Sequence, residues 1–324
     1  MATITLTANT NVSALSLANG DTIDLAGFVL TLDVQPTQTG IQVITPDTAG
    51  TCVFPVACVI PTWSFTAGTG PLIATLPANC EIGSVTGGTG ANADGVNVNN
   101  GTVSVSATGG SGNAAIGVRT NNGTVSGAVT GGTNTNANGV STNSATGVIS
   151  GNISPGGNFG VGTNNGLISG NCAVGVSGGF CVVTNNNQIT GNVTAGSTSG
   201  AAINVNNGEI SGTLTAGGGA SAHGCVTNNG TILSAVGGAN ATAYGVNTNN
   251  GLVLGLDDNT AFAVNVWNGH RAFVFGLQAN GRIPNNIKTV YSIGQLSQNA
   301  TIGSDCEVIE LIDVSDVLNF TGLR

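Results

Sequence analysis

A turn motif of the form T-N-N-G returns at nearly constant intervals along the middle of this chain. Complete or near-complete copies end at Gly101, Gly123, Gly166, Gly208, Gly230 and Gly251, and degenerate copies place Cys80, Gly147, Asn187 and Gly269 at the same position. The interval of about 21 residues is typical of one coil in a protein built from stacked repeats. The sequence therefore predicts a β-solenoid between residues 80 and 269.

Apolar residues keep fixed places relative to this turn. Two residues after it stand Ile82, Val103, Val125, Ile149, Ile168, Ile189, Ile210, Ile232 and Val253, and four residues further on stand Val129, Ile153, Cys172, Val193, Leu214 and Val236. Before the turn stand Val96, Val118, Val140, Val161, Val182, Ile203, Cys225, Val246 and Val264. Residues at even spacing on an extended segment share one face, so we expect these columns inside the solenoid. The same spacing predicts that the following column, which includes Thr120 and Thr142, also points inward.

Each turn carries a pair of asparagines, such as Asn121 and Asn122 or Asn206 and Asn207. Neighbouring coils place equivalent residues about 4.8 Å apart. Stacked side-chain amides at that spacing can hydrogen-bond along the axis as a ladder. We therefore predict amide ladders that run from coil to coil.

The predicted fold is all-β: a parallel β-helix (β-solenoid) of about nine to ten coils with an irregular N-terminal region and a C-terminal cap. Residues 1–79 hold most of the prolines and are expected to form a capping or docking region with a Pro-rich insertion. Residues 80–269 form the solenoid repeat. Residues 270–324 are expected to form a cap or an oligomerisation and docking strand, because acidic side chains there discourage edge-to-edge pairing.

The seven cysteines are an odd number, which argues against a complete disulfide framework. Cys172 and Cys225 stand in interior columns, where a free cysteine acts as a small buried hydrophobe. The sequence leaves open whether Cys52 and Cys58 form a disulfide bond or belong to a metal site. Zinc is not expected, because the chain has no C-x-x-C motif.

The formal charge of −9 with only 5 lysines and arginines leaves no basic patch for phosphates. We therefore expect neither nucleic-acid binding nor attachment to an anionic membrane. The first residues lack the basic and apolar segments of a secretory signal, which favours a cytoplasmic site of synthesis.

Catalytic groups are sparse along the repeat. Between residues 82 and 256 the charged side chains are Asp94, Arg119 and Glu209, and the two acids are expected about 25 Å apart, too far to cooperate in glycoside hydrolysis. A polar cluster of Asp257, Asp258, His270 and Arg271 follows, and we interpret it as the transition to the cap. No catalytic, cofactor or metal site is predicted.

Two binding functions are also set aside. An ice-binding face is not expected if the threonine column points inward. Between residues 82 and 256 the aromatic residues that could form a glycan platform are Phe159, Phe180 and Tyr244. Trp63 and Trp267, near the two ends of the chain, are left as possible glycan contacts.

Coils such as N-N-G-T-V-S-G-A-V-T-G-G, residues 121–132, resemble two groups of parallel β-solenoids. One group is the passengers of bacterial surface adhesins and autotransporters. The other is the tailspike-like proteins of tailed-phage particles. The resemblance covers residues 80–269 and concerns architecture and texture.

The phage resemblance implies a virion protein that is assembled in the host cytoplasm, where free cysteines stay reduced. It favours a capsid decoration (cement) protein that stabilises the shell, with a tail fibre or tailspike as the alternative and a bacterial adhesin after that. The expected partners are the major capsid protein or other virion proteins, together with further copies of this chain in a dimer or trimer.

Overall fold

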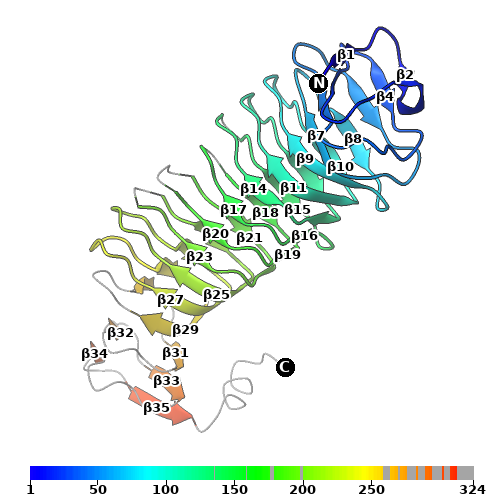
Figure 1. Ribbon diagram of the computed structural model, residues 1–324. Helices are drawn as coiled ribbons and strands as arrows, with labels where there is room; N and C mark the ends of the chain where they lie inside the picture. The colour runs from blue at the N-terminus through cyan, green and yellow to red at the C-terminus, as the bar shows by residue number, and fades with distance from the viewer. Residues whose placement is uncertain are drawn as a thin grey trace. The chain divides into compact units, whose positions relative to one another are not determined.

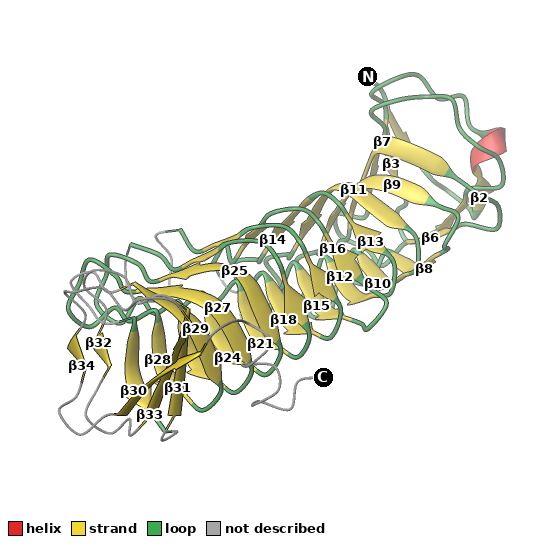
Figure 2. Cartoon of the chain, turned by 90° about the horizontal axis from the view of Figure 1, so that it is seen from below, coloured by secondary structure: helices red, strands yellow, loops and turns green. Residues whose placement is uncertain are grey.

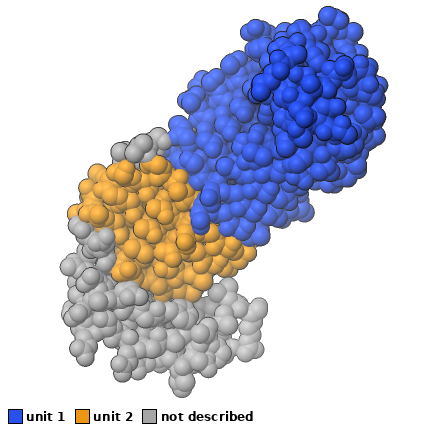
Figure 3. All heavy atoms as spheres, in the orientation of Figure 1, with its two compact units in different colours: residues 1–171, 179–183 blue, residues 172–178, 184–324 orange. Residues whose placement is uncertain are grey.

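The computed structural model describes residues 1–134, 136–157, 159–175, 179–197, 200–257 and 263–268, and the strand segments 271–275, 282–283, 289–293, 301–302 and 307–311. The predicted fold class is confirmed: the chain is an all-β parallel β-solenoid of about 12 turns of about 21 residues. Two compact units can be distinguished (Figure 3). Unit 1 is Met1–Asn171 with Gly179–Val183, and unit 2 is Cys172–Gly178 with Thr184–Arg324.

Unit 1 places its strands on two walls (Figure 1). The first wall consists of β1 (Thr3–Thr5), β3 (Thr22–Asp24), β5 (Gln42–Ile44), β7 (Val59–Thr66), β9 (Glu81–Thr86), β11 (Thr102–Thr108), β13 (Thr124–Val125), β14 (Ala128–Thr130), β16 (Val148–Ile149), β17 (Ile153–Ser154) and β19 (Leu167–Ile168). The second wall consists of β2 (Thr10–Asn11), β4 (Val29–Thr31), β6 (Thr51–Val53), β8 (Ile73–Leu76), β10 (Val96–Asn99), β12 (Val118–Asn121), β15 (Val140–Asn143) and β18 (Val161–Asn164). β21 (Val182–Asn185) begins in unit 1 and ends in unit 2.

Unit 2 repeats this arrangement. Its first wall holds β20 (Cys172–Ala173), β22 (Gln188–Ile189), β23 (Val193–Thr194), β25 (Glu209–Thr215), β27 (Thr231–Val236) and β29 (Leu252–Asp257). Its second wall holds β24 (Ile203–Asn206), β26 (Cys225–Asn228), β28 (Val246–Asn249) and β30 (Val264–Trp267). Neighbouring strands pair in parallel, so equivalent residues of successive coils become register partners, as Val96 and Val118 do in unit 1.

Helix contributes little to the described residues. A short 3-10 helix, η1 (Val12–Ala14), follows β2 (Figure 2). No helix among the described residues is long and apolar enough to cross a membrane.

The N-terminal region is more regular than the sequence suggested. β3, β5, β7 and β9 pair in sequence, and so do β4, β6, β8 and β10, so the coils begin near residue 3. The coil count of about 12 therefore differs slightly from the expected nine to ten, because the N-terminal region adds regular coils to the solenoid. The prolines were misleading as an indicator of irregular structure. Pro61 lies within β7, at the register irregularity between Ile60 and Ser64. The others in this region lie outside the strands, where they leave the ladder of hydrogen bonds intact: Pro36, Pro46, Pro55, Pro71 and Pro77.

The C-terminal strands also stack in parallel. β31 (Arg271–Phe275), β33 (Thr289–Ile293) and β35 (Glu307–Leu311) form one sheet, while β32 (Arg282–Ile283) and β34 (Thr301–Ile302) form another. Arg271 pairs with Thr289, which pairs with Glu307, so the strands repeat every 18 residues (289 − 271 and 307 − 289). The coil pattern thus continues beyond Gly269 with a shorter repeat.

The interior columns are confirmed with two exceptions. Val96, Val118 and Val140 are fully buried, as are Val103 and Val125. The first exception is the column that starts at Val98: its threonines are half-exposed, and the asparagine one position later is buried instead.

The second exception is Val236. A register irregularity between β25 and β27 makes Ala235 the partner of Leu214, so Ala235 is buried and Val236 lies half-exposed. One residue fewer between the two halves of β27 moves the next side chain to the other face.

Candidate functional site

A ladder of buried asparagine amides runs through unit 1. Its members are Asn99, Asn121, Asn143 and Asn164, each the last residue of its strand and each fully buried. The Nδ2 atom of each residue donates to the Oδ1 atom of the next, over 2.7, 2.8 and 2.8 Å. The ladder occupies the interior place that the sequence assigned to threonine.

Unit 2 contains an equivalent ladder of Asn185, Asn206, Asn228 and Asn249, linked by Nδ2 to Oδ1 distances of 2.7 Å at each step. Each amide also binds main chain: Asn206 Nδ2 donates to the carbonyl oxygen of Gly208 at 3.1 Å. A buried amide is costly unless its donors and acceptor are paired, and here the coils above and below provide the partners.

Apolar residues stand at two positions that flank the ladders. In unit 1, Asn99 pairs in register with Leu76 of the preceding coil. In unit 2, Asn249 pairs in register with Trp267 of the following coil. The asparagine column therefore ends at the coil of Leu76 in unit 1, and its register position in the coil after Asn249 is occupied by Trp267.

The second asparagine of each turn forms an outer ladder. In unit 2, Asn207 donates to Asn186, Asn229 to Asn207, and Asn250 to Asn229, over 2.8 to 2.9 Å. Here the donor lies in the later coil, whereas in the buried ladder it lies in the earlier one. Both of the predicted amide stacks therefore exist, and their side-chain dipoles point in opposite directions along the coils.

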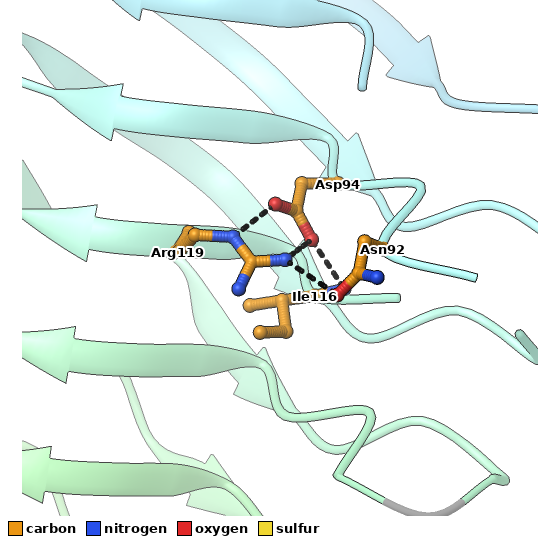
Figure 4. A network of polar contacts seen from close by, with 4 residues as sticks. All are labelled: Asn92, Asp94, Ile116 and Arg119. Carbon is orange, nitrogen blue, oxygen red and sulfur yellow. Dashed lines mark hydrogen bonds and ion pairs between the residues drawn. The ribbon is translucent and has the colours of Figure 1, made fainter. Parts of the chain in front are cut away.

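Asp94 and Arg119 form the charged centre of unit 1 (Figure 4). Asp94 lies in the turn before β10 and is 1% exposed, while Arg119 is the second residue of β12. The Nε atom of Arg119 binds Asp94 Oδ2, and its second guanidinium nitrogen donates to Oδ1 at 3.0 Å. The backbone N–H of Ile116 donates to the same Oδ1 at 3.1 Å, and Asn92 accepts a weaker bond of 3.4 Å from Arg119.

This arrangement is an ion pair that links two successive coils rather than a reactive centre. Burial raises the pKa of Asp94, and the hydrogen bonds from Arg119 and Ile116 oppose that rise. Both carboxylate oxygens are engaged and the charge is balanced by the guanidinium. A general base needs a free oxygen in reach of a substrate proton, and Asp94 offers none.

Asp94 belongs to a column whose side chains differ from coil to coil. The residues that precede the second wall in successive coils of unit 1 are Asp94, Ile116, Asn138, Phe159 and Phe180. The rings of Phe159 and Phe180 lie 5.9 Å apart, half-exposed, and Asn138 Oδ1 is buried with no hydrogen-bond partner. At this position, the chemistry of the side chain therefore changes from one coil of unit 1 to the next.

The corresponding column of unit 2 contains His223 and Tyr244. Their rings stack at 5.5 Å with an interplanar angle of 9°, and the backbone N–H of Tyr244 donates to His223 Nδ1 at 3.2 Å. That bond requires the neutral imidazole with its proton on Nε2. Burial lowers the pKa of His223, which favours the same neutral form.

The other candidate residues named from the sequence lie at separate places in the structure. Trp63 is fully buried, and its indole donates to the carbonyl oxygen of Gln38 at 2.8 Å, so it offers no glycan platform. Glu209 lies half-exposed in unit 2, whereas Asp94 belongs to unit 1. Asp257 is exposed at the end of β29. Asp258, His270 and the side chains of Trp267 and Arg271 lie outside the described residues.

The described residues contain six free cysteines, all buried: Cys52, Cys58, Cys80, Cys172, Cys181 and Cys225. No group of three or more His, Cys, Asp or Glu side chains among these described residues is arranged to hold a metal ion.

Similarity to known proteins gives no further guide. No protein-family model, curated protein or solved structure matches the chain. The site is therefore interpreted from its own geometry.

Sequence reasoning missed the contacts between coils, although the spacing held a signal for several of them. Phe159 and Phe180 are 21 residues apart (180 − 159), as are His223 and Tyr244 (244 − 223), which is one coil. Asp94 and Arg119 are 25 residues apart, which is more than one coil. The coil length alone therefore did not predict their pairing.

Proposed function

We propose that this chain is a non-enzymatic structural protein of a virus particle, and specifically a decoration protein that stabilises the capsid of a tailed phage. Its main partner is the major capsid protein, and copies of the chain associate as dimers or trimers on the shell. The observation that carries the proposal is the buried amide ladder, which joins successive coils within each unit.

The ladder supports a mechanical role. Asn206 uses its Oδ1 atom to accept from Asn185 and its Nδ2 atom to donate to Asn228 and to the backbone of Gly208. An amide with its bonds satisfied inside the fold resists local opening, because separating two coils would leave buried donors and acceptors unpaired. Such a unit transmits load along its coils without chemical turnover.

Exposed apolar side chains on the first coils support docking through the N-terminal region. Val34, Val53, Val56 and Val59 are exposed there. A cavity of about 220 Å³ lies beside Val34, lined by apolar residues such as Leu15 and Leu17 and by polar ones such as Gln35 and Gln38. Exposed apolar side chains of this kind favour a protein interface.

The test is the position and effect of the protein on the particle made by the virus that encodes it. We expect cryo-electron microscopy to show it repeated over the icosahedral shell. Particles assembled without it should release their genome at a lower temperature than complete particles. Density restricted to the tail would replace this function by a tail fibre or spike, and absence from every particle would reject a virion role.

A matched pair of variants tests the docking surface. Val59 and Val105 are similarly exposed, at 53% and 54%, but only Val59 belongs to the N-terminal coils. Val59→Asp should prevent incorporation into particles, whereas Val105→Asp should not. Normal incorporation of Val59→Asp would show that another surface docks. Removing residues 1–79 is unsuitable, because it would uncover the buried Ile82 and Val85 of the next coil.

A further inference from the structure

Cys58 and Cys80 are neighbours across two coils of unit 1. Each residue immediately precedes a strand of the first wall, and the following residues, Val59 and Glu81, are register partners. The backbone N–H of Glu81 donates to the carbonyl oxygen of Cys58 at 2.8 Å, so the register extends back to the cysteines. Register partners in parallel strands direct their side chains to the same face.

The sulfur of Cys80 leans toward the coil that carries Cys58. Its thiol donates to the carbonyl oxygen of Val56, two residues before Cys58, at 3.5 Å. The backbone N–H of Cys58 also faces this sulfur. Both side chains are buried, Cys58 at 0% and Cys80 at 3% exposure, while Ala57 and Asn79 beside them are exposed.

We propose that Cys58 and Cys80 are an oxidation site at which a disulfide bond joins the two coils once the protein meets a small-molecule disulfide such as oxidised glutathione. Neighbouring strands place equivalent Cα atoms roughly 4.8 Å apart, inside the range of about 4.4–6.8 Å that disulfides span. The inference does not depend on the proposed virion role.

The reaction is two successive thiol–disulfide exchanges. The thiolate of one cysteine attacks a sulfur of oxidised glutathione, forms a mixed disulfide and releases one glutathione thiolate. The thiolate of the other cysteine then attacks the protein sulfur of that mixed disulfide and releases the second. Two protein thiols are oxidised, one glutathione disulfide is reduced, and the two protons pass to the departing thiolates.

The surroundings of the thiols set the speed of this reaction. Burial, assisted by the nearby Cys80, raises the pKa of Cys58 to about 12. Burial also raises the pKa of the Cys80 thiol, although the N–H of Cys58 opposes the rise. Because the thiolate is the attacking species, oxidation should be slow near neutral pH and should accelerate as the pH rises.

Cys52 is a natural control within the same region. It lies in β6 on the second wall, where its register partners are Leu30 and Ile73, and it is buried. The pairing of Cys52 with Cys58, which the sequence left open, would require a sulfur on each wall to meet. The structure instead gives Cys58 its partner one coil later.

The experiment incubates the folded protein with oxidised glutathione at pH 8 and pH 9, blocks the remaining thiols, and maps peptides without reduction. Chymotryptic cleavage after Trp63 separates Cys80 from Cys52 and Cys58, and elastase cleavage after Val56 separates Cys52 from Cys58. We expect one cross-linked pair that contains Cys58 and Cys80, formed faster at pH 9. Cys52→Ser should form the same cross-link.

Variants and stability complete the test. Cys58→Ser and Cys80→Ser should lose the cross-link and carry at most one glutathione on the remaining cysteine of the pair. Oxidation should raise the urea midpoint of wild-type protein but not of Cys80→Ser, because the cross-link restricts the unfolded chain. A Cys52–Cys58 peptide, glutathione on both cysteines, or two unreacted thiols after prolonged incubation at pH 9 would each overturn the proposal.

Discussion

The Nδ2 atom of Asn206 donates to the Oδ1 atom of Asn228 in the next coil over 2.7 Å, and both side chains are fully buried. Because their amides bond to each other, these polar residues at the end of a strand can be buried in the core. Because each amide needs the next one, the ladder specifies the register of the coils as well as stabilising their stacking.

Asn206→Asp should unfold unit 2 far more easily than Asn207→Asp. The first change removes the donor to Asn228 and buries a negative charge, which costs about 3–5 kcal/mol when the charge has no counterion. The second changes an exposed amide and should cost within about 0.5 kcal/mol. Urea unfolding at pH 7 measures both, and equal costs would contradict the assignment of the inner ladder to the core.

Gly217 and Gly218 are adjacent glycines with opposite tolerance for a side chain. A Cβ atom at Gly217 would lie 1.7 Å from the carbonyl oxygen of Gly196 in the neighbouring coil, whereas one at Gly218 meets nothing within 4 Å. Gly217→Ala must force two backbones apart and should cost about 3 kcal/mol or more. Gly218→Ala should stay within about 1 kcal/mol of wild type. Thermal unfolding distinguishes them, and similar melting temperatures would contradict the close stacking.

The contributions of Asp94 and Arg119 to stability should be coupled, because the two side chains form an ion pair. Arg119→Gln leaves a buried carboxylate without its counterion, while Asp94→Asn removes the charge itself. A double-mutant cycle with both changes should give a coupling energy in the upper part of the range of about 0.5–3 kcal/mol found for residues in contact. Additive effects in urea unfolding would mean that the two side chains do not cooperate.

His223 should make unit 2 less stable in acid. Burial lowers its pKa in the folded protein below the ordinary value of 6.5, so the unfolded chain takes up a proton first as the pH falls. Its stabilising contribution is therefore complete above that value and is lost as the pH falls through it toward the lower folded pKa. Protonation also puts an N–H on Nδ1, where Tyr244 now donates.

The measurement for His223 is the urea midpoint between pH 8 and pH 5. His223→Gln removes the titrating group and should flatten the part of the profile near pH 6 relative to wild type. Identical profiles would exclude His223 as the source of that dependence.

The Asn–Gly steps of the outer ladder should resist deamidation. The reaction needs the backbone nitrogen of glycine to attack the preceding side-chain amide and release ammonia. In the folded protein, the N–H of Gly230 donates to the carbonyl oxygen of Asn206, and the Asn229 amide is held by Asn207. Mass spectrometry after incubation at alkaline pH should show deamidation of Asn229 in urea-unfolded protein well before native protein. Equal rates would contradict a rigid turn.

Periodicity made the fold predictable because a solenoid repeats its sequence with its structure. Val96, Val118 and Val140 could be recognised as interior residues since their spacing equals one coil. The same approach failed at Thr120, because it assumed strict alternation up to the end of the strand. The chain bends before Asn121, which brings two residues three positions apart, Val118 and Asn121, to the interior.

The candidate site was less predictable than the fold. The sequence counted Asp94 and Arg119 as isolated charges, but the bend of the corner brings them together. It placed a Pro-rich insertion within residues 1–79, although the strands β7 and β8 of that region keep register with β9 and β10. It also compared Cys58 with Cys52, the nearer cysteine along the chain, rather than with the cysteine one coil away.

The sequence by itself determined the coil length, the parallel all-β fold and most interior columns, because these follow from residues that recur at one period. Only the tertiary structure decided which asparagine enters the core, where the first coil begins, and which side chains meet between coils. Those outcomes depend on corner geometry and on register between strands. A residue's partner lies about one coil away, and a one-residue change at a bend decides which face it joins.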